Sequence, residues 1–248
     1  MNFCIKSDIG NFRKENQDRA GIISKGNWTL AMLCDGMGGH FGGSKCAQIT
    51  VDTLKQYFEQ SFPEEMQDLD RSNINKWFNN ALSFIKKALV NCTEKEPIYR
   101  DMGTTLTAAL VFNLTKSVYI FNIGDSRTYI YNGLLHLVTR DQNFLHQLIN
   151  IHNWKPEEAR KHPDANKLVS CLGPNKTMQS DGFFIKGQAS VKYILLTSDG
   201  VHDFIEKPQI ELILQNRKMT LEEKCDKLIT IAKKNLSRDN LTVELVEL

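Results

Sequence analysis

Apolar runs along the chain predict seven β-strands. The runs are rich in Val, Ile, Leu, Tyr and Thr, which favour extended backbone, and polar or glycine-containing segments separate them. They lie at residues 3–7, 28–34, 104–112, 118–123, 127–131, 191–197 and 241–246. Seven strands make up most of two sheets, so the pattern predicts a core built on sheets.

Three other segments repeat apolar residues every three to four positions, which is typical of amphipathic helices. Their apolar stripes are Ala47, Val51, Leu54 and Phe58; Ile74, Phe78, Ala81, Leu82, Ile85 and Leu89; and Leu221, Cys225, Leu228, Ile229 and Ala232. A one-sided apolar stripe needs a partner surface, so these helices are expected to pack against the sheets.

The order of the predicted elements favours an α+β fold with antiparallel pairing over regular βαβ winding. We find no repeat, linker or low-complexity tract, and therefore expect a single domain over residues 1–248. The least regular part starts at Asp141 and contains several prolines, histidines and asparagines. We interpret residues from about 141 to 172 as a flap-like insert.

Charge and composition limit the classes of partner that the protein is expected to bind. The chain has 248 residues, 41% of them apolar, and a formal net charge of +2, without the concentrated positive charge of a dedicated nucleic-acid binder. Its start lacks a signal-peptide pattern and it has no apolar run long enough to cross a bilayer. We expect a cytoplasmic protein, with no membrane or nucleic-acid partner and with its six cysteines reduced.

Four aspartates, each predicted to stand at the end of an apolar run, carry the candidate chemistry. They are Asp35, Asp125, Asp199 and Asp239. Carboxylates gathered at one rim of a sheet form an oxygen-ligand site suited to Mg²⁺ or Mn²⁺. An Asp-Gly pair is more often a hairpin turn, but no partner strand directly follows Asp35-Gly36 or Asp199-Gly200.

Other chemistries fit the sequence less well. The glycine-rich segment after Asp35 has Gly43-Ser44-Lys45 where a nucleotide-binding loop needs Gly-Lys-Ser/Thr. Ser126 lacks the Gly-x-Ser-x-Gly context of an activated nucleophile. The six histidines show no His-x-x-x-His spacing for zinc. Taken alone, Arg13 would be a solvated surface charge.

Six short motifs, taken together, resemble the signatures of the metal-dependent, type-2C protein serine/threonine phosphatases. They are Gly10-x-x-Arg13-x-x-Asn16-Gln17-Asp18, Asp35-Gly36-Met37-Gly38-Gly39-His40, Met102-Gly103-Thr104-Thr105, Gly124-Asp125-Ser126-Arg127, Ser198-Asp199-Gly200 and Asp239-Asn240-x-Thr242. They follow the family's order, and the Met-Gly-Gly-His form is similar to its bacterial branch. The resemblance implies a four-layer α-β-β-α sandwich, two antiparallel sheets flanked by helices, with the metal site at one end.

The resemblance also implies roles for individual residues. Asp35 would bridge two Mn²⁺ or Mg²⁺ ions, with the Gly36 carbonyl as a further ligand, while Asp199 and Asp239 would complete the first metal's shell. Asp125, with Asp199, would help to hold a third ion, and Asp18 of the first motif belongs to the same metal-binding set. Arg13 would bind the substrate phosphate, which its planar guanidinium suits.

Two positions depart from the family pattern. Gln17 stands where the family usually has a glutamate that supports the second metal, which questions the affinity of that site. Met37 stands where other branches have a histidine assigned as general acid. This leaves His40 and a metal-bound water as alternatives for that role.

The predicted function is hydrolysis of phosphoserine and phosphothreonine in proteins by direct attack of a metal-bridging hydroxide, without a phospho-enzyme. Expected partners are phosphorylated substrates of a serine/threonine kinase, and the protein is expected to be a monomer. The first alternative is a catalytically weak pseudophosphatase that binds phosphoproteins, and Gln17 is its support. A metal-dependent phosphodiesterase or nuclease is the second, which the near-neutral charge does not favour.

Overall fold

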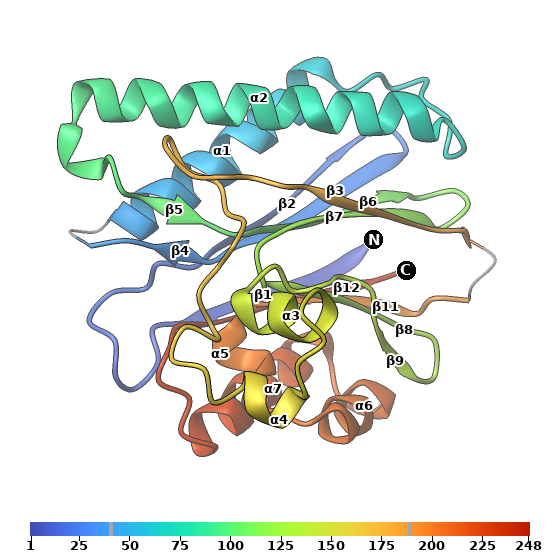
Figure 1. The fold of residues 1–248 in the computed structure, drawn as a ribbon. Coiled ribbons are helices and arrows are strands. Elements are labelled where there is room, and N and C mark those ends of the chain that lie inside the picture. Colours follow the sequence, from blue (N-terminus) through green and yellow to red (C-terminus); the bar gives the residue numbers. More distant parts are fainter. Residues whose placement is uncertain (40–41, 188–189) are drawn as a thin grey trace.

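The computed structural model describes residues 1–39, 42–187 and 190–248. Two five-stranded sheets, in which every pairing is antiparallel, lie face to face (Figure 1). The first has the order β1 (Asn2–Asp8), β12 (Leu241–Glu247), β11 (Tyr193–Thr197), β8 (Arg127–Tyr131) and β9 (Leu135–Leu137). The second has the order β10 (Asp181–Ile185), β7 (Ser117–Ile123), β6 (Leu106–Phe112), β3 (Trp28–Cys34) and β2 (Arg19–Lys25).

Helices cover the outer face of each sheet (Figure 1). The long helices α1 (Gly42–Ser61) and α2 (Arg71–Lys95) cover the second sheet, and the 3₁₀ turn η1 (Pro97–Tyr99) follows them. Helices α5 (Asp199–His202), α6 (Lys207–Gln215) and α7 (Leu221–Lys234) cover the first sheet. The predicted four-layer α-β-β-α sandwich is therefore confirmed. None of the helices in the described ranges is long and apolar enough to span a membrane.

The strand pattern follows from burial on both faces of the central strands. In β3, Leu30 and Met32 pack toward α1 and α2, whereas Ala31 and Leu33 pack between the two sheets. Strands β3, β6 and β7 have seven residues each, and all of these residues are buried. Strands of this kind have continuous apolar sequences, which is why the sequence reveals them clearly.

The edges of the sheets differ from the sequence prediction. Strands β2, β9 and β10 were not expected, because each is short or partly exposed and β2 and β10 contain Gly21 and Gly182. The run predicted at 104–112 divides into β5 (Gly103–Thr104), which pairs with β4 (Gly36–Met37), and β6. The strand predicted at 191–197 begins at Tyr193, and the helix predicted from Ser44 begins at Gly42.

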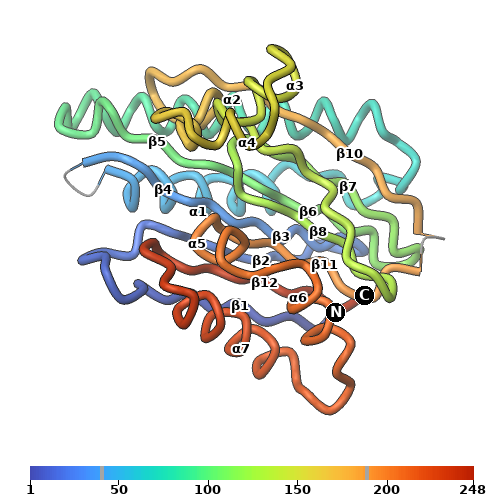
Figure 2. The backbone as a smooth tube through the Cα atoms, turned by 60° about the horizontal axis from the view of Figure 1, so that its bottom comes forward, coloured from blue at the N-terminus to red at the C-terminus, as the bar shows by residue number. Residues whose placement is uncertain are grey.

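The predicted insert contains two short helices, α3 (Phe144–Asn150) and α4 (Pro156–Ala159). Figures 1 and 2 show both outside the two sheets. The Phe144 N–H donates to the Lys167 carbonyl at 2.9 Å, and the Val169 N–H donates to the Gln142 carbonyl at 2.9 Å. The insert, residues 141–172, thus leaves and rejoins the sandwich at one place; we call it the flap.

Candidate metal centre

The ends of strands from both sheets bring four aspartates to one cavity. Asp35 follows β3, Asp125 follows β7, and Asp199 follows β11 as the first residue of α5. Asp239 was expected at the end of an apolar run, which is wrong, because it precedes β12. Since β12 is antiparallel to β11, its start lies beside the end of β11. All four line a cavity of about 420 Å³.

Asp18, immediately before β2, is a fifth carboxylate in this region. Its side chain is buried, and one oxygen, Oδ2, accepts a hydrogen bond from the Ser198 hydroxyl at 2.8 Å. The other oxygen, Oδ1, is buried without a hydrogen-bond partner, and so is Oδ1 of Asp199. A buried carboxylate oxygen without a partner is costly, and a bound cation would remove that cost.

The carboxylates hinder one another's ionisation. Burial, followed by the charges of neighbouring aspartates, raises the pKa of Asp199 to about 8 and that of Asp35 well above its usual range. Burial also raises the pKa of Asp18 and of Asp125 to about 6. Divalent cations would stabilise the ionised forms, so this donor set suits such an ion.

The arrangement still requires ligands besides acidic side chains. In the part of the chain that the structure describes, no three His, Cys, Asp or Glu side chains stand ready to enclose one ion. The carbonyl of Gly36, which lines the cavity, and water would have to complete the coordination. A side chain at Gly36 would collide with the Gly43 backbone, so the close approach of β4 and α1 beside Asp35 needs glycine.

Arg13 provides positive charge at the cavity. Its guanidinium donates to Oδ2 of Asp239, the main cause that raises the pKa of Arg13, and its side chain is 54% exposed. Gly10, three residues earlier, has φ +81° and packs so closely on the Asp239 carbonyl that a Cβ would collide with it. The first motif and the last are therefore in direct contact.

Hydroxyl and amide groups that had no supporting role in the sequence prediction hold the aspartates in place. The Asp35 N–H donates to the Thr105 hydroxyl at 2.8 Å, and Thr105 in turn contacts Ser126 at 2.7 Å. The Asn240 side chain accepts the Gln17 N–H at 2.9 Å and donates to the Ile9 and Glu15 carbonyls. The motif strings contained these residues, but only the fold shows their partners.

Both residues that depart from the family pattern, Gln17 and Met37, lie at the cavity. Gln17 lines the cavity, and its amide donates to Glu15 at 3.1 Å, so a carboxylate lies next to the neutral side chain. Met37 also lines the cavity. His40, proposed as general acid, lies outside the described residues.

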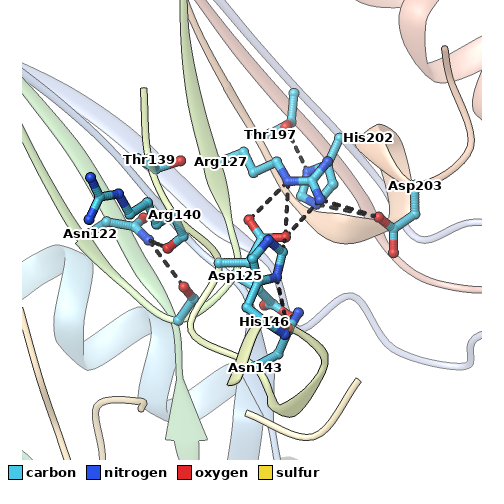
Figure 3. Close-up of polar contacts among 12 residues, drawn as sticks. Asn122, Asp125, Arg127, Thr139, Arg140, Asn143, His146, Thr197, His202 and Asp203 are labelled. Carbon is cyan, nitrogen blue, oxygen red and sulfur yellow. Dashed lines mark hydrogen bonds and ion pairs between the residues drawn. The ribbon is translucent and has the colours of Figure 1, made fainter. Parts of the chain in front are cut away.

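A polar network extends from Asp125 away from the cavity (Figure 3). The Asn143 amide donates to Asp125 at 3.3 Å. Arg127 donates from two of its nitrogens to the buried carboxylate of Asp141, at 2.7 to 3.2 Å, and lies 4.0 Å from Asp203. These charged groups pair with each other, so Asp125 remains available to the cavity.

Comparisons with known proteins agree with this geometry. The model of the family described as Protein phosphatase 2C matches residues 13–238. The serine/threonine phosphatase stp of Listeria monocytogenes is 33% identical, and the match covers 100% of this chain and 96% of that protein. The protein phosphatase PhpP of Streptococcus pneumoniae is 28% identical, with 100% and 98% covered.

Solved structures of bacterial phosphatases have the same fold. The serine/threonine phosphatase Stp1 from Staphylococcus aureus superposes with a TM-score of 0.85 at 33% identity, over 99% of this chain and 94% of that one. The Mycobacterium tuberculosis serine/threonine phosphatase PstP/Ppp gives 0.83 at 29% identity, over 100% and 98%. With the family match over most of its length and relatives at this identity, the chain belongs to the protein phosphatase 2C family, in its bacterial branch.

Proposed function

We propose that this protein hydrolyses phosphoserine and phosphothreonine in other proteins, with Mn²⁺ or Mg²⁺ as cofactor. One observation supports this proposal above all. Aspartates from four separate segments line one cavity, Asp18 is buried close to them, Asp18 and Asp199 each have a buried carboxylate oxygen without a partner, and the guanidinium of Arg13 lies at the same cavity. The relatives named as serine/threonine phosphatases support the same substrate class.

Two ions would be held by Asp35, the Gly36 carbonyl, Asp199 and Asp239, with Asp18 close behind them. Asp125 and Asp199 are the candidates for a third. When bound, such ions supply Lewis-acid chemistry, since they lower the pKa of water and neutralise phosphoryl oxygens.

Arg13 would bind and orient the phosphoryl group. Its guanidinium contacts Asp239, and the side chain, which lines the cavity, is about half exposed to solvent. A phosphate monoester presents oxygens that can accept two parallel hydrogen bonds from one guanidinium. Arg13 would thus fix the phosphorus atom relative to the aspartates, which is the positioning that phosphoryl transfer requires.

Three side chains that could form a covalent phospho-enzyme, those of Ser126, Cys34 and Cys46, are poorly placed for nucleophilic attack. Ser126 is fully buried, and its hydroxyl is engaged with Thr105. Burial raises the pKa of Cys34 and of Cys46, which disfavours the nucleophilic thiolate. Direct attack by water on phosphorus is the mechanism that these observations favour.

A pseudophosphatase that binds phosphoproteins without turnover is the second candidate. The neutral amide of Gln17 at the cavity is the observation in its favour. Against it, Glu15 lies within hydrogen-bonding distance of that amide, and all the expected aspartates are present. A cytoplasmic location, a monomeric state and a partner kinase remain predictions.

A substrate panel tests the proposal. The protein is incubated with Mn²⁺ and, separately, a phosphothreonine peptide, a cyclic nucleotide and single-stranded DNA. We expect phosphate release from the peptide alone, abolished by a chelator. Cleavage of the cyclic nucleotide or the DNA in preference to the peptide would support the nuclease alternative. Tight binding of the peptide without phosphate release would support the pseudophosphatase.

A further inference from the structure

The flap is fastened to the turn that carries Asp125. Gln142 makes two hydrogen bonds with Gly124. Its side-chain carbonyl accepts the Gly124 N–H at 2.9 Å, and its backbone N–H donates to the Gly124 carbonyl at 3.0 Å. The Gln142 amide also donates to Asp181 of β10 at 3.1 Å. The first residues of the flap therefore have a fixed position relative to Asp125.

Asn143 touches both Asp125 and the flap helix α3 (Figure 3). Its Nδ2 donates to Oδ2 of Asp125 at 3.3 Å. Its Oδ1 accepts the His146 N–H at 3.2 Å, which makes Asn143 the N-cap of α3, and lies 3.1 Å from Nδ1 of the same histidine. Asn143 is only 6% exposed, so water does not readily replace these contacts.

The C-terminal end of the flap contacts Gln142 and Asn143, the residues at its start. Asn143 forms a β-bridge with Leu168, next to the hydrogen bond from Val169 to Gln142. Asn166, Lys167 and Leu168 line the cavity together with Asp125. Asn143 thus links a cavity carboxylate, through its side chain, to flap residues that line the cavity, through its backbone bridge to Leu168.

We infer that Asn143 is a positioning residue that couples cation binding at Asp125 to the placement of residues 166–168, which line the cavity. A cation at Asp125 fixes the carboxylate that the Asn143 amide holds, and the same side chain caps α3. By linkage, an ordered flap then favours the cation as much as the cation favours the ordered flap. This inference rests on the proposed function only in taking Asp125 as a cation ligand.

Hydrogen–deuterium exchange of residues 144–168, with and without Mn²⁺, tests the coupling without any need for turnover. In the wild type we expect Mn²⁺ to slow exchange of the flap about tenfold, the size of effect expected for one hydrogen bond to a charged group. Asn143→Ser keeps a capping oxygen but loses the amide. In this variant the Mn²⁺ effect should fall below about twofold.

Asn150→Ser is the matched control, because Asn150 is exposed at the other end of α3. It should respond to Mn²⁺ like the wild type. If Asn143 only stabilised the helix, its variant would exchange faster by the same factor with and without Mn²⁺, which would overturn the inference. The inference would also be overturned if Mn²⁺ left the exchange rate of the wild-type flap unchanged while the loss of the free-ion electron paramagnetic resonance signal showed that Mn²⁺ was bound. Failure of the wild type to bind Mn²⁺ would overturn it as well.

Absence of phosphatase activity alongside the expected exchange pattern would overturn the proposed function and leave the coupling standing.

Discussion

At the scale of single residues, Arg13 is the side chain whose proposed role can be separated from cation binding. We expect Arg13→Ala to reduce kcat/KM for a phosphothreonine peptide about 10- to 100-fold, because the charge-assisted hydrogen bonding to phosphate that is lost contributes about 1.5–3 kcal/mol in total. Mn²⁺ affinity, measured by titration calorimetry, should stay within a few-fold of the wild type. Arg217→Ala is a control, since Arg217 is exposed just after the end of α6 and does not line the cavity. Undiminished turnover of Arg13→Ala would contradict the role of Arg13.

The site residues differ in how far sequence could predict them. Asp35, Asp125 and Asp199 end strands with strong apolar patterns, so their convergence could be predicted. The hydrogen bond from Ser198 to Asp18 joins positions 180 apart in sequence, and no local pattern encodes such a partner. The same holds for Asn143, which in the sequence is only one of several asparagines in the irregular insert and gains its link to Asp125 only through the fold.

At the scale of elements, the flap is the part expected to govern substrate access. Its helices lie outside the sheets, while residues 166–168 reach the cavity. Replacing residues 146–164 with a short Gly/Ser linker should reduce kcat/KM for peptides about tenfold, equivalent to ~1.4 kcal/mol of binding. Hydrolysis of a small aryl phosphate, which needs only the cavity, should change less than threefold when Mn²⁺ is saturating, so that weaker cation binding does not limit turnover. Equal losses on both substrates would refute this role of the flap.

Central and edge elements were not equally predictable. The buried strands β3, β6 and β7 and the striped helices α1, α2 and α7 gave clear periodic patterns. The edge strands β2 and β10 did not, because partial exposure mixes polar and apolar residues and glycine interrupts both. Their pairing is determined by the neighbouring strand more than by their own composition.

At the scale of the whole molecule, one acidic side chain lies in the contact between the two sheets. Glu244 of β12 is fully buried beside Leu196 of β11, which packs between the sheets, and neither carboxylate oxygen has a hydrogen-bond partner. Burial raises the pKa of Glu244 well above its usual range, and the charge of Lys55 only partly opposes this. The folded protein therefore keeps a proton there at a pH at which the unfolded chain has released it.

The sign of the pH dependence follows from this raised pKa. Above the ordinary pKa of glutamate, the folded state binds more protons than the unfolded state, so stability falls as pH rises toward the folded-state pKa. Glu244→Gln, which cannot ionise, should match the wild type near pH 4 and exceed its free energy of unfolding by about 1–3 kcal/mol at pH 8. Urea denaturation at both pH values measures the difference. The control Glu59→Gln, at an exposed position, should have the same free energy of unfolding as the wild type at both pH values. A Glu244→Gln variant less stable than the wild type at pH 8 would contradict the account.

The central claim is that the gathered aspartates hold the divalent ions needed for phosphopeptide hydrolysis. The most direct test is Mn²⁺-dependent phosphate release from a phosphothreonine peptide by the wild type, Asp35→Asn and Asp239→Asn, with a chelator control. We predict release by the wild type, its loss with the chelator, and a decrease of at least about 100-fold in both variants, since each loses a charged ligand. Undiminished release in the chelator, or from both variants, would contradict the claim.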